Sequence, residues 1–421
     1  GNVTVAGGSI SDNDVLANIE NIIGSAYNDS FSGDAMGNYF IGGDGADTFS
    51  GGAGNDSFDG NGTGAVQLSS LIDIASYAYL NQVYQAVSVR LNGSQWTTAT
   101  VTNTASGTDV DNLINIEGVI GSAGSDTIIG DNFANLLFGG NGNDCFGGST
   151  GNDTIDGGNG NDIVDYSFVS GATETFLIPA AGTINVTKTV GGQSSTDTLI
   201  NIESISGLQL AGGSATTGAS VNFSSVSINL GMIGTAYADT IIGGAGNDTI
   251  RGASGNDTID GGLGGRDLID YSYASGGISV NLNGTTSSLI SVGIGDIDTI
   301  VNIEGVITAG GNDTINNSAV NFEYFSGSSN ADIFIGDNNA NSIFGAAGND
   351  TLFSGGGNDC FDGGDGSDVI DLSFVTTGIS LSVYQKTNLG LPIASTYTAP
   401  SGAVISFINF EGIIGGSGDD S

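Results

Sequence analysis

Aspartates recur at a fixed step through this sequence of 421 residues. In residues 42–50 (GGDGADTFS) and 51–59 (GGAGNDSFD), an aspartate is the sixth of nine residues, and glycines are the first, second and fourth. Carboxylate oxygens are hard ligands that suit calcium or magnesium. The sixth-position aspartates are therefore predicted metal ligands: Asp29, Asp47, Asp56, Asp126, Asp144, Asp153, Asp162, Asp239, Asp248, Asp257, Asp267, Asp332, Asp350, Asp359 and Asp368.

Three sixth positions carry asparagine instead, at Asn38, Asn135 and Asn341. All three lie in degenerate units that keep the nine-residue step, such as residues 130–138 (GDNFANLLF). An amide is a weaker metal ligand than a carboxylate, so these half-sites are expected to be weak or empty.

The composition favours cations as partners. With 45 acidic and 5 basic residues, the net charge is −40. Nucleic acids and anionic membrane surfaces both require lysine or arginine, so neither is an expected partner. Histidine is absent, which removes the usual general base and the commonest zinc ligand. No residue set predicts catalysis or the binding of an organic cofactor, and we expect the chain not to be an enzyme.

The elements that position these aspartates follow from the unit itself. Glycines permit a tight turn, and the next three residues suffice for a short strand whose middle side chain points inward. Two units then complete one coil of about eighteen residues, and successive coils stack at roughly 4.8 Å. This stacking places Asp126, Asp144 and Asp162 in one column and Asn135 and Asp153 in another.

Bare carboxylates at that spacing repel, whereas a divalent cation completed by turn carbonyls makes the contact attractive. Calcium fits better than magnesium, which demands stricter geometry and keeps its waters. An ion-free solenoid is the alternative, since Gly-Asn-Asp turns form without metal.

A longer period overlies the short one. After each run comes a strand-like segment, such as residues 270–284, and then a signature such as residues 111–121 (DNLINIEGVIG). The approximate periods are 1–110, 111–196, 197–297 and 298–407, with 408–421 opening a fifth, and we predict one continuous all-β solenoid over 1–421. The signature glutamates Glu20, Glu117, Glu203, Glu304 and Glu411 are expected to be structural rather than catalytic, and calcium contact by them stays open.

At GGAGNDSFD the chain resembles the repeats-in-toxin (RTX) family, whose nonapeptide GGxGxDxUx it matches at every defined position. The resemblance implies a parallel β-roll with several calcium ions bound between its turns. It also implies type I secretion from a bacterium and folding outside the cell.

Two functions fit these features. The first is an extracellular structural protein of the bacterial cell surface: a surface layer, filament or adhesin segment. Residues 11–30 and 402–421 share one phase, so head-to-tail self-association is expected. The second is the calcium-binding accessory module of a larger secreted enzyme or toxin. Ice binding would need a flat row of identical polar residues, which is absent, and no stretch is apolar enough to span a membrane.

The two cysteines, Cys145 and Cys360, occupy the same slot of the unit (NDCF) many coils apart. That separation is far beyond the reach of a disulfide. They are therefore expected to be free or to bridge two chains.

Overall fold

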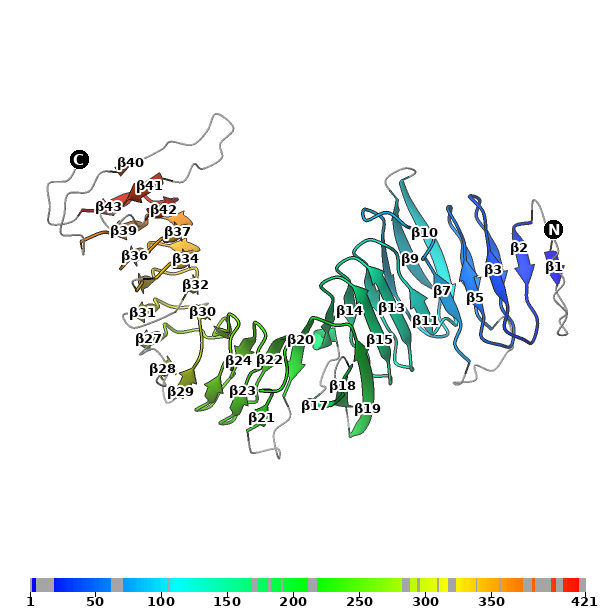
Figure 1. Cartoon of the computed structure of the whole chain (residues 1–421), viewed down its shortest axis with the longest axis horizontal. Helices are drawn as coiled ribbons and strands as arrows, with labels where there is room; N and C mark the ends of the chain where they lie inside the picture. The colour runs from blue at the N-terminus through cyan, green and yellow to red at the C-terminus, as the bar shows by residue number, and fades with distance from the viewer. Residues whose placement is uncertain are drawn as a thin grey trace. The chain divides into compact units, whose positions relative to one another are not determined.

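The computed structural model describes residues 2–4, 19–61, 71–103, 107–168, 173–180, 183–190, 192–210, 218–281, 288–293, 296–308, 310–316, 323–337, 339–355, 357–373, 381–382, 395–398 and 404–415. It forms two compact units, Gly1–Gln209 and Leu210–Ser421, which are described separately (Figure 1). Continuity of one solenoid across 1–421, with the period boundaries given above, stays a prediction.

Each unit consists of two stacks of short strands, and within a run the neighbouring strands are parallel. Asn21 pairs with Tyr39, and Tyr39 pairs with Ser57. Equivalent residues are 18 apart in sequence, which confirms the predicted coil of two nine-residue units. The parallel β-roll predicted from the repeats is therefore the observed fold.

The first stack of unit 1 contains, in order of pairing, β1 (Asn2–Thr4), β2 (Asn21–Ile23), β4 (Tyr39–Ile41), β6 (Ser57–Asp59), β10 (Gly107–Ile114), β9 (Thr97–Asn103), β8 (Ala86–Arg90), β12 (Thr127–Ile129), β14 (Cys145–Gly147), β16 (Ile163–Asp165) and β20 (Ser204–Gln209). The second contains β3 (Ser30–Ser32), β5 (Thr48–Ser50), β7 (Ile74–Ser76), β11 (Gly118–Ile120), β13 (Leu136–Asn141), β15 (Thr154–Asn159), β19 (Gln193–Ile200), β18 (Thr183–Val190) and β17 (Thr173–Ala180). A 3₁₀ turn, η1 (Tyr166–Phe168), follows β16.

The first stack of unit 2 contains β22 (Asn229–Ile233), β24 (Thr249–Arg251), β26 (Leu268–Asp270), β30 (Gly305–Ile307), β32 (Tyr324–Ser326), β34 (Ser342–Phe344), β37 (Cys360–Asp362), β42 (Val404–Ile408), β41 (Ser395–Thr398) and β40 (Leu381–Ser382). The second contains β21 (Ser220–Asn222), β23 (Thr240–Ile242), β25 (Thr258–Asp260), β29 (Asp296–Val301), β28 (Ser288–Gly293), β27 (Ser279–Asn281), β31 (Thr314–Asn316), β33 (Ile333–Ile335), β36 (Thr351–Phe353), β39 (Val369–Asp371) and β43 (Gly412–Ile414). Two turn segments, β35 (Ala347–Gly348) and β38 (Asp365–Gly366), also pair.

The core lies between the two stacks, where the middle residue of each three-residue strand points inward. Phe31 and Phe49 come from one stack of unit 1, and Phe40 and Phe58 come from the other. Their rings stack across the core at 5.4 Å (Phe31 with Phe40) and 5.5 Å (Phe49 with Phe58). One inward residue per nine therefore suffices for a closed apolar core, because its neighbours are the inward residues of adjacent coils.

Antiparallel hairpins interrupt the parallel stacks between runs, which the sequence did not predict. Strand β9 pairs antiparallel with β8 and β10, and β18 pairs antiparallel with β17 and β19. Within the described part of the predicted strand-like segment 270–284, Asp270 ends β26 and residues 279–281 form the short strand β27, which pairs with β28. The segments between runs exceed nine residues, so the chain folds back on itself before the next coil begins.

Candidate metal columns at the turns

The sixth-position side chains stack at the turns as predicted, and most of the aspartates accept a main-chain N–H of the preceding coil. The main-chain N–H of Asp126 donates to Oδ1 of Asp144 at 2.8 Å, and that of Asp144 donates to Oδ1 of Asp162 at 2.8 Å. We call each such series a carboxylate column. The columns run from Asp29 to Asp47 and Asp73; Asn38 to Asp56 and Asp111; Asp126 to Asp144 and Asp162; Asn135 to Asp153 and Asp197; Asp239 to Asp257 and Asp298; Asp248 to Asp267; Asp313 to Asp332, Asp350 and Asp368; and Asn341 to Asp359.

In some turns the second carboxylate oxygen, Oδ2, also finds a donor inside its own turn. The N–H of Ser122 donates to Oδ2 of Asp126 at 2.6 Å, and that of Thr235 donates to Oδ2 of Asp239 at 2.7 Å. Asp29 and Asp332 are held in the same way by Ser25 and Ser328. These turns lie early in their runs, and their carboxylates are satisfied by the chain alone.

In most of the Gly-rich turns Oδ2 lacks such a donor, the exception being Asp248, whose Oδ2 accepts the N–H of Gly244 at 2.7 Å. The second residue of these turns adopts a left-handed backbone, with φ of 113° at Gly140 and 74° at Ala253. The carboxylates of Asp144 and Asp257 are then buried with Oδ2 unpaired. The buried Oδ2 atoms without a hydrogen bond belong to Asp47, Asp56, Asp144, Asp162, Asp257, Asp313, Asp350 and Asp368.

At several of these turns a main-chain carbonyl from the next coil approaches Oδ2 at the first glycine of the turn. A Cβ placed on Gly42 would lie 2.0 Å from Oδ2 of Asp47 and 2.5 Å from the carbonyl oxygen of Gly60. At Gly139 the corresponding distances to Asp144 and Gly157 are 2.1 and 2.6 Å. The first glycine is therefore required because oxygen atoms from two coils already fill the space of a side chain.

This donor set fits calcium, which takes six to eight hard oxygens in flexible geometry. Within the described ranges, no three acidic or cysteine side chains converge on one point, so main-chain carbonyls must supply most of the oxygens. A bound calcium ion would neutralise the unpaired carboxylates and link successive coils. The ligand role of the fifteen aspartates stays a prediction.

Burial leaves these carboxylates electrostatically strained without a cation. It raises the pKa of Asp56, Asp144, Asp257 and Asp350 to about 7, and that of Asp47 to about 6. Neighbouring carboxylates raise these pKa values further, while the main-chain N–H donors lower them. The folded chain therefore holds negative charge in places that disfavour it.

Sequence reasoning missed several members of the columns. Asp111, Asp197 and Asp298 stand at the head of the signatures DNLINIE, DTLINIE and DTIVNIE, and each occupies a sixth-position slot. Asp73 and Asp313 also occupy sixth-position slots, although no full nonapeptide surrounds them in the sequence. The recurring aspartate at the head of the signature was the available signal for the first three.

The signature glutamates end the columns, which confirms a structural role for four of them. Oε2 of Glu203 accepts the N–H of Asp162 at 2.8 Å, and Oε2 of Glu304 accepts that of Asp267 at 2.8 Å. Glu117 and Glu411 do the same for Asp73 and Asp368. The longer glutamate thus takes the place of the next aspartate.

The asparagine of each signature replaces the turn glycine. Asn115, Asn201, Asn302 and Asn409 adopt left-handed φ angles of 55°, 50°, 52° and 56°. Their side-chain amides donate at 2.7–2.8 Å to Asp59, Asp156, Asp260 and Asp362, respectively. The turn, which is Asn-Ile-Glu at three of these positions and Asn-Phe-Glu at 409–411, therefore closes a run.

Replacing Asn115 tests this closing turn. Asn115→Ala should lower the free energy of unfolding in calcium by about 2 kcal/mol, because it forces alanine into the left-handed region and removes a charge-assisted hydrogen bond. Asn115→Gly keeps the backbone conformation and should cost about 1 kcal/mol less. Urea unfolding monitored by Trp96 fluorescence measures both, and equal losses would contradict this account.

The three asparagine turns are complete without a metal. The N–H of Asp131 donates to Oδ1 of Asn135 at 2.8 Å, and Nδ2 of Asn135 donates to Oδ1 of Asp131 at 3.2 Å. In the turns at Asn38 and Asn341, the second residue of the unit is likewise an aspartate, Asp34 or Asp337. Its main-chain N–H donates to the side-chain amide oxygen of the asparagine. This agrees with the predicted weak or empty half-sites.

Calcium counting separates the two kinds of turn. Asp144→Asn should lower the number of bound calcium ions by at least one, because it removes an unpaired buried carboxylate. The matched control, Asp131→Asn, should leave the number unchanged, since its carboxylate already serves the turn. Elemental analysis of the two variants at equal free calcium decides between these outcomes.

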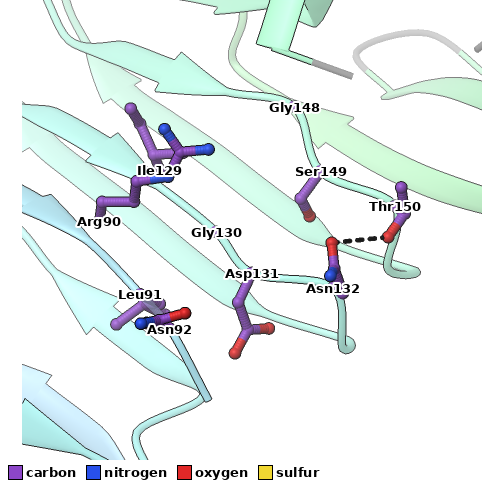
Figure 2. A pocket seen from close by; sticks show the side chains of 10 residues that line it. All are labelled: Arg90, Leu91, Asn92, Ile129, Gly130, Asp131, Asn132, Gly148, Ser149 and Thr150. Atoms are coloured by element: carbon purple, nitrogen blue, oxygen red, sulfur yellow. Dashed lines mark hydrogen bonds between the residues drawn. The ribbon is translucent and has the colours of Figure 1, made fainter. Parts of the chain in front are cut away.

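A polar pocket of about 270 Å³ lies at one edge of unit 1 (Figure 2). Arg90 and Asp131 line it, and the hydroxyl of Thr150 donates to Oδ1 of Asn132 at 3.0 Å. One lining residue, Ser149, donates its hydroxyl to Oδ2 of Asp153 at 2.5 Å, so the pocket borders a carboxylate column.

The two cysteines are free, one half-buried at Cys145 and one exposed at Cys360. Among the described residues, no helix is long and apolar enough to cross a membrane.

Comparison with known families decides what the repeats are. The model of the RTX calcium-binding nonapeptide repeat (4 copies) matches residues 32–62, 120–148, 148–168, 233–268 and 326–371. The chain carries RTX calcium-binding repeats. The matched segments contain most of the unpaired Oδ2 atoms described above, so the RTX repeats overlap with the carboxylate columns.

Other comparisons add less. No curated protein sequence matches the chain. Among solved structures, an extracellular lipase, LipA from Serratia marcescens, is 17% identical, and the alignment covers 71% of this chain and 42% of the lipase with a TM-score of 0.19. The alignment thus spans less than half the length of that protein.

Proposed function

We propose that this chain is an extracellular calcium-binding structural protein, part of a bacterial surface layer, filament or adhesin, and that it is not an enzyme. Its β-roll folds and stiffens when calcium fills the carboxylate columns. The observation that carries the proposal is the set of buried, unpaired Oδ2 atoms in both units, from Asp47 to Asp368.

Charge and affinity explain why such a protein works outside the cell. At −40 the metal-free chain repels itself. Extracellular calcium sites have dissociation constants of roughly 10⁻⁴ to 10⁻³ M, so they fill where calcium is millimolar and stay empty in the cytosol. Binding then drives folding at the point of export.

Self-association is the second part of the proposal. Open ends of β-stacks are unpaired strand edges, which pair readily with another chain. The matching ends predicted from sequence, 11–30 and 402–421, lie partly outside the described residues. Their similarity in sequence supports head-to-tail joining of copies.

Light scattering and electron microscopy test this function at rising protein concentration. Calcium should produce ordered assemblies, whereas EGTA or magnesium alone should not. A folded protein that stays monomeric in millimolar calcium would contradict a self-assembling role. It would favour the alternative, a calcium-binding accessory module of a larger secreted enzyme or toxin.

A further inference from the structure

One of the five basic side chains is fully buried inside a carboxylate column. Lys188 lies on β18, and its ammonium group is 2.5 Å from Oδ1 of Asp197 and 3.6 Å from Oδ2 of Asp153. It also donates to the carbonyl oxygen of Gly151 at 2.9 Å. A buried ammonium requires this many partners, because desolvation is otherwise too costly.

These partners are the oxygen types expected around a metal ion. Asp153 and Asp197 are successive members of one column, and the N–H of Asp153 donates to Oδ1 of Asp197 at 2.9 Å. Gly151 belongs to the turn that ends at Asp153. Two carboxylates from two coils and one turn carbonyl thus converge on the nitrogen of Lys188.

Two other periods repeat this arrangement without the lysine. The N–H of Asp56 donates to Asp111 at 2.8 Å, and the N–H of Asp257 donates to Asp298 at 2.9 Å. At both positions, Oδ2 of the first aspartate is buried and unpaired. We call each pair of successive column members a step. In the Asp153–Asp197 step, which contains the lysine, Oδ2 of Asp153 accepts the hydroxyl of Ser149 and faces the ammonium.

Strand register identifies the residue that replaces the lysine in the first period. Lys188 lies opposite Ser195, two residues before Asp197. In the first period, Val101 lies opposite Asp109, two residues before Asp111. Val101 is buried and uncharged, so the Asp56–Asp111 step has no cation from its hairpin.

The tyrosine beside each step is the same in the second and third periods. Tyr166 donates to Oδ2 of Asp197 at 2.8 Å, and Tyr271 donates to Oδ2 of Asp298 at 2.9 Å. The tyrosine contact is therefore shared, and the two sites differ in the cation and in the second turn residue, which is Ser149 beside Asp153 and Ala253 beside Asp257.

We propose that the ammonium of Lys188 substitutes for a calcium ion in the Asp153–Asp197 step. This step is held by a cation that is part of the chain, whereas the Asp56–Asp111 and Asp257–Asp298 steps require a metal. The inference rests on calcium binding by the repeats but not on the proposed extracellular assembly. It removes Asp153 from the set of calcium ligands and gives unit 1 one brace that survives chelation.

Two variants of the full-length chain, one at Lys188 and one at Val101, test whether the lysine replaces a calcium ion. Lys188→Met keeps the length of the side chain and removes its charge, so this variant should bind one calcium ion more than the wild type. Val101→Lys should bind one fewer. Bound calcium is counted by elemental analysis at equal free calcium, with circular dichroism to verify folding.

Terbium provides a local readout, because a tyrosine near the ion sensitises its luminescence. Lys188→Met should gain terbium emission on tyrosine excitation, and the further change Tyr166→Phe should remove that gain. An additional ion bound elsewhere would leave the gain in place and overturn the assignment.

The outcomes separate this inference from the proposed function. A wild type that binds calcium, with a folded Lys188→Met that binds the same number, overturns the inference alone. A wild type that binds no calcium overturns both. If Lys188→Met does not fold in calcium, Val101→Lys decides, and an unchanged count in that variant overturns the substitution.

Discussion

Removing calcium at pH 7.5 is expected to abolish most of the β-structure. The buried Oδ2 atoms of residues such as Asp144 and Asp350 have no hydrogen-bond donor among the described residues, and successive coils bring ionised carboxylates together. The strands are mostly three residues long, so each coil contributes little pairing of its own. Far-UV circular dichroism in EGTA should show a largely unfolded chain, and millimolar calcium should restore the β signal.

Two controls make this result specific. Magnesium at the same concentration should restore little structure, because it requires octahedral geometry and gives up its waters reluctantly. Small-angle scattering should show expansion in EGTA and compaction on adding calcium. An unchanged β signal after exhaustive chelation, with no metal detected in the sample, would refute metal columns.

Acidification to about pH 5 should partly restore the fold of the calcium-free protein. Burial raises the pKa of Asp56, Asp144, Asp257 and Asp350 from 3.8 to about 7. Between these two values the folded state binds more protons than the unfolded state, so the free energy of unfolding falls as the pH rises. The stability of the metal-free fold is therefore greatest below pH 4 and is lost as the pH passes 7.

The calcium-loaded protein should show the opposite dependence. Protons compete with calcium for the same carboxylates, so the apparent affinity falls as the pH is lowered and binding near pH 6 releases protons. Circular dichroism in EGTA at pH 5 and pH 8, and calcium titration at the same two values, measure both trends. A metal-free chain that is equally unfolded at pH 5 and pH 8 would show that the carboxylates do not control folding. At pH 5 the chain still carries a net negative charge, because the isoelectric point expected from its sequence is about 4.1.

The repeat made much of the fold predictable. The nine-residue step fixes the coil, and the stacking of Asp126, Asp144 and Asp162 follows from it. The inward Phe40 and Phe58 could be assigned for the same reason, since one apolar residue occupies one place in the unit. Local periodicity carries this information, so a single sequence suffices.

The hairpins between runs were harder to predict because their partners are set by pairing rather than by periodicity. Asp111 enters its column only because β10 pairs with β6, far away in sequence. Lys188 reaches its column only because β18 folds back on β19. Neither contact follows from the spacing of residues along the chain.

The hydrogen bonds along the columns have a polarity with a consequence for how such proteins change in length. The donor always belongs to the earlier coil and the acceptor to the later one, from Asp126 through Asp162 to the terminating Glu203. A cassette of two GGxGxD units inserted before the signature would meet a donor on one side and an acceptor on the other. Genetic duplication could therefore lengthen a run by whole cassettes while its terminator is left untouched.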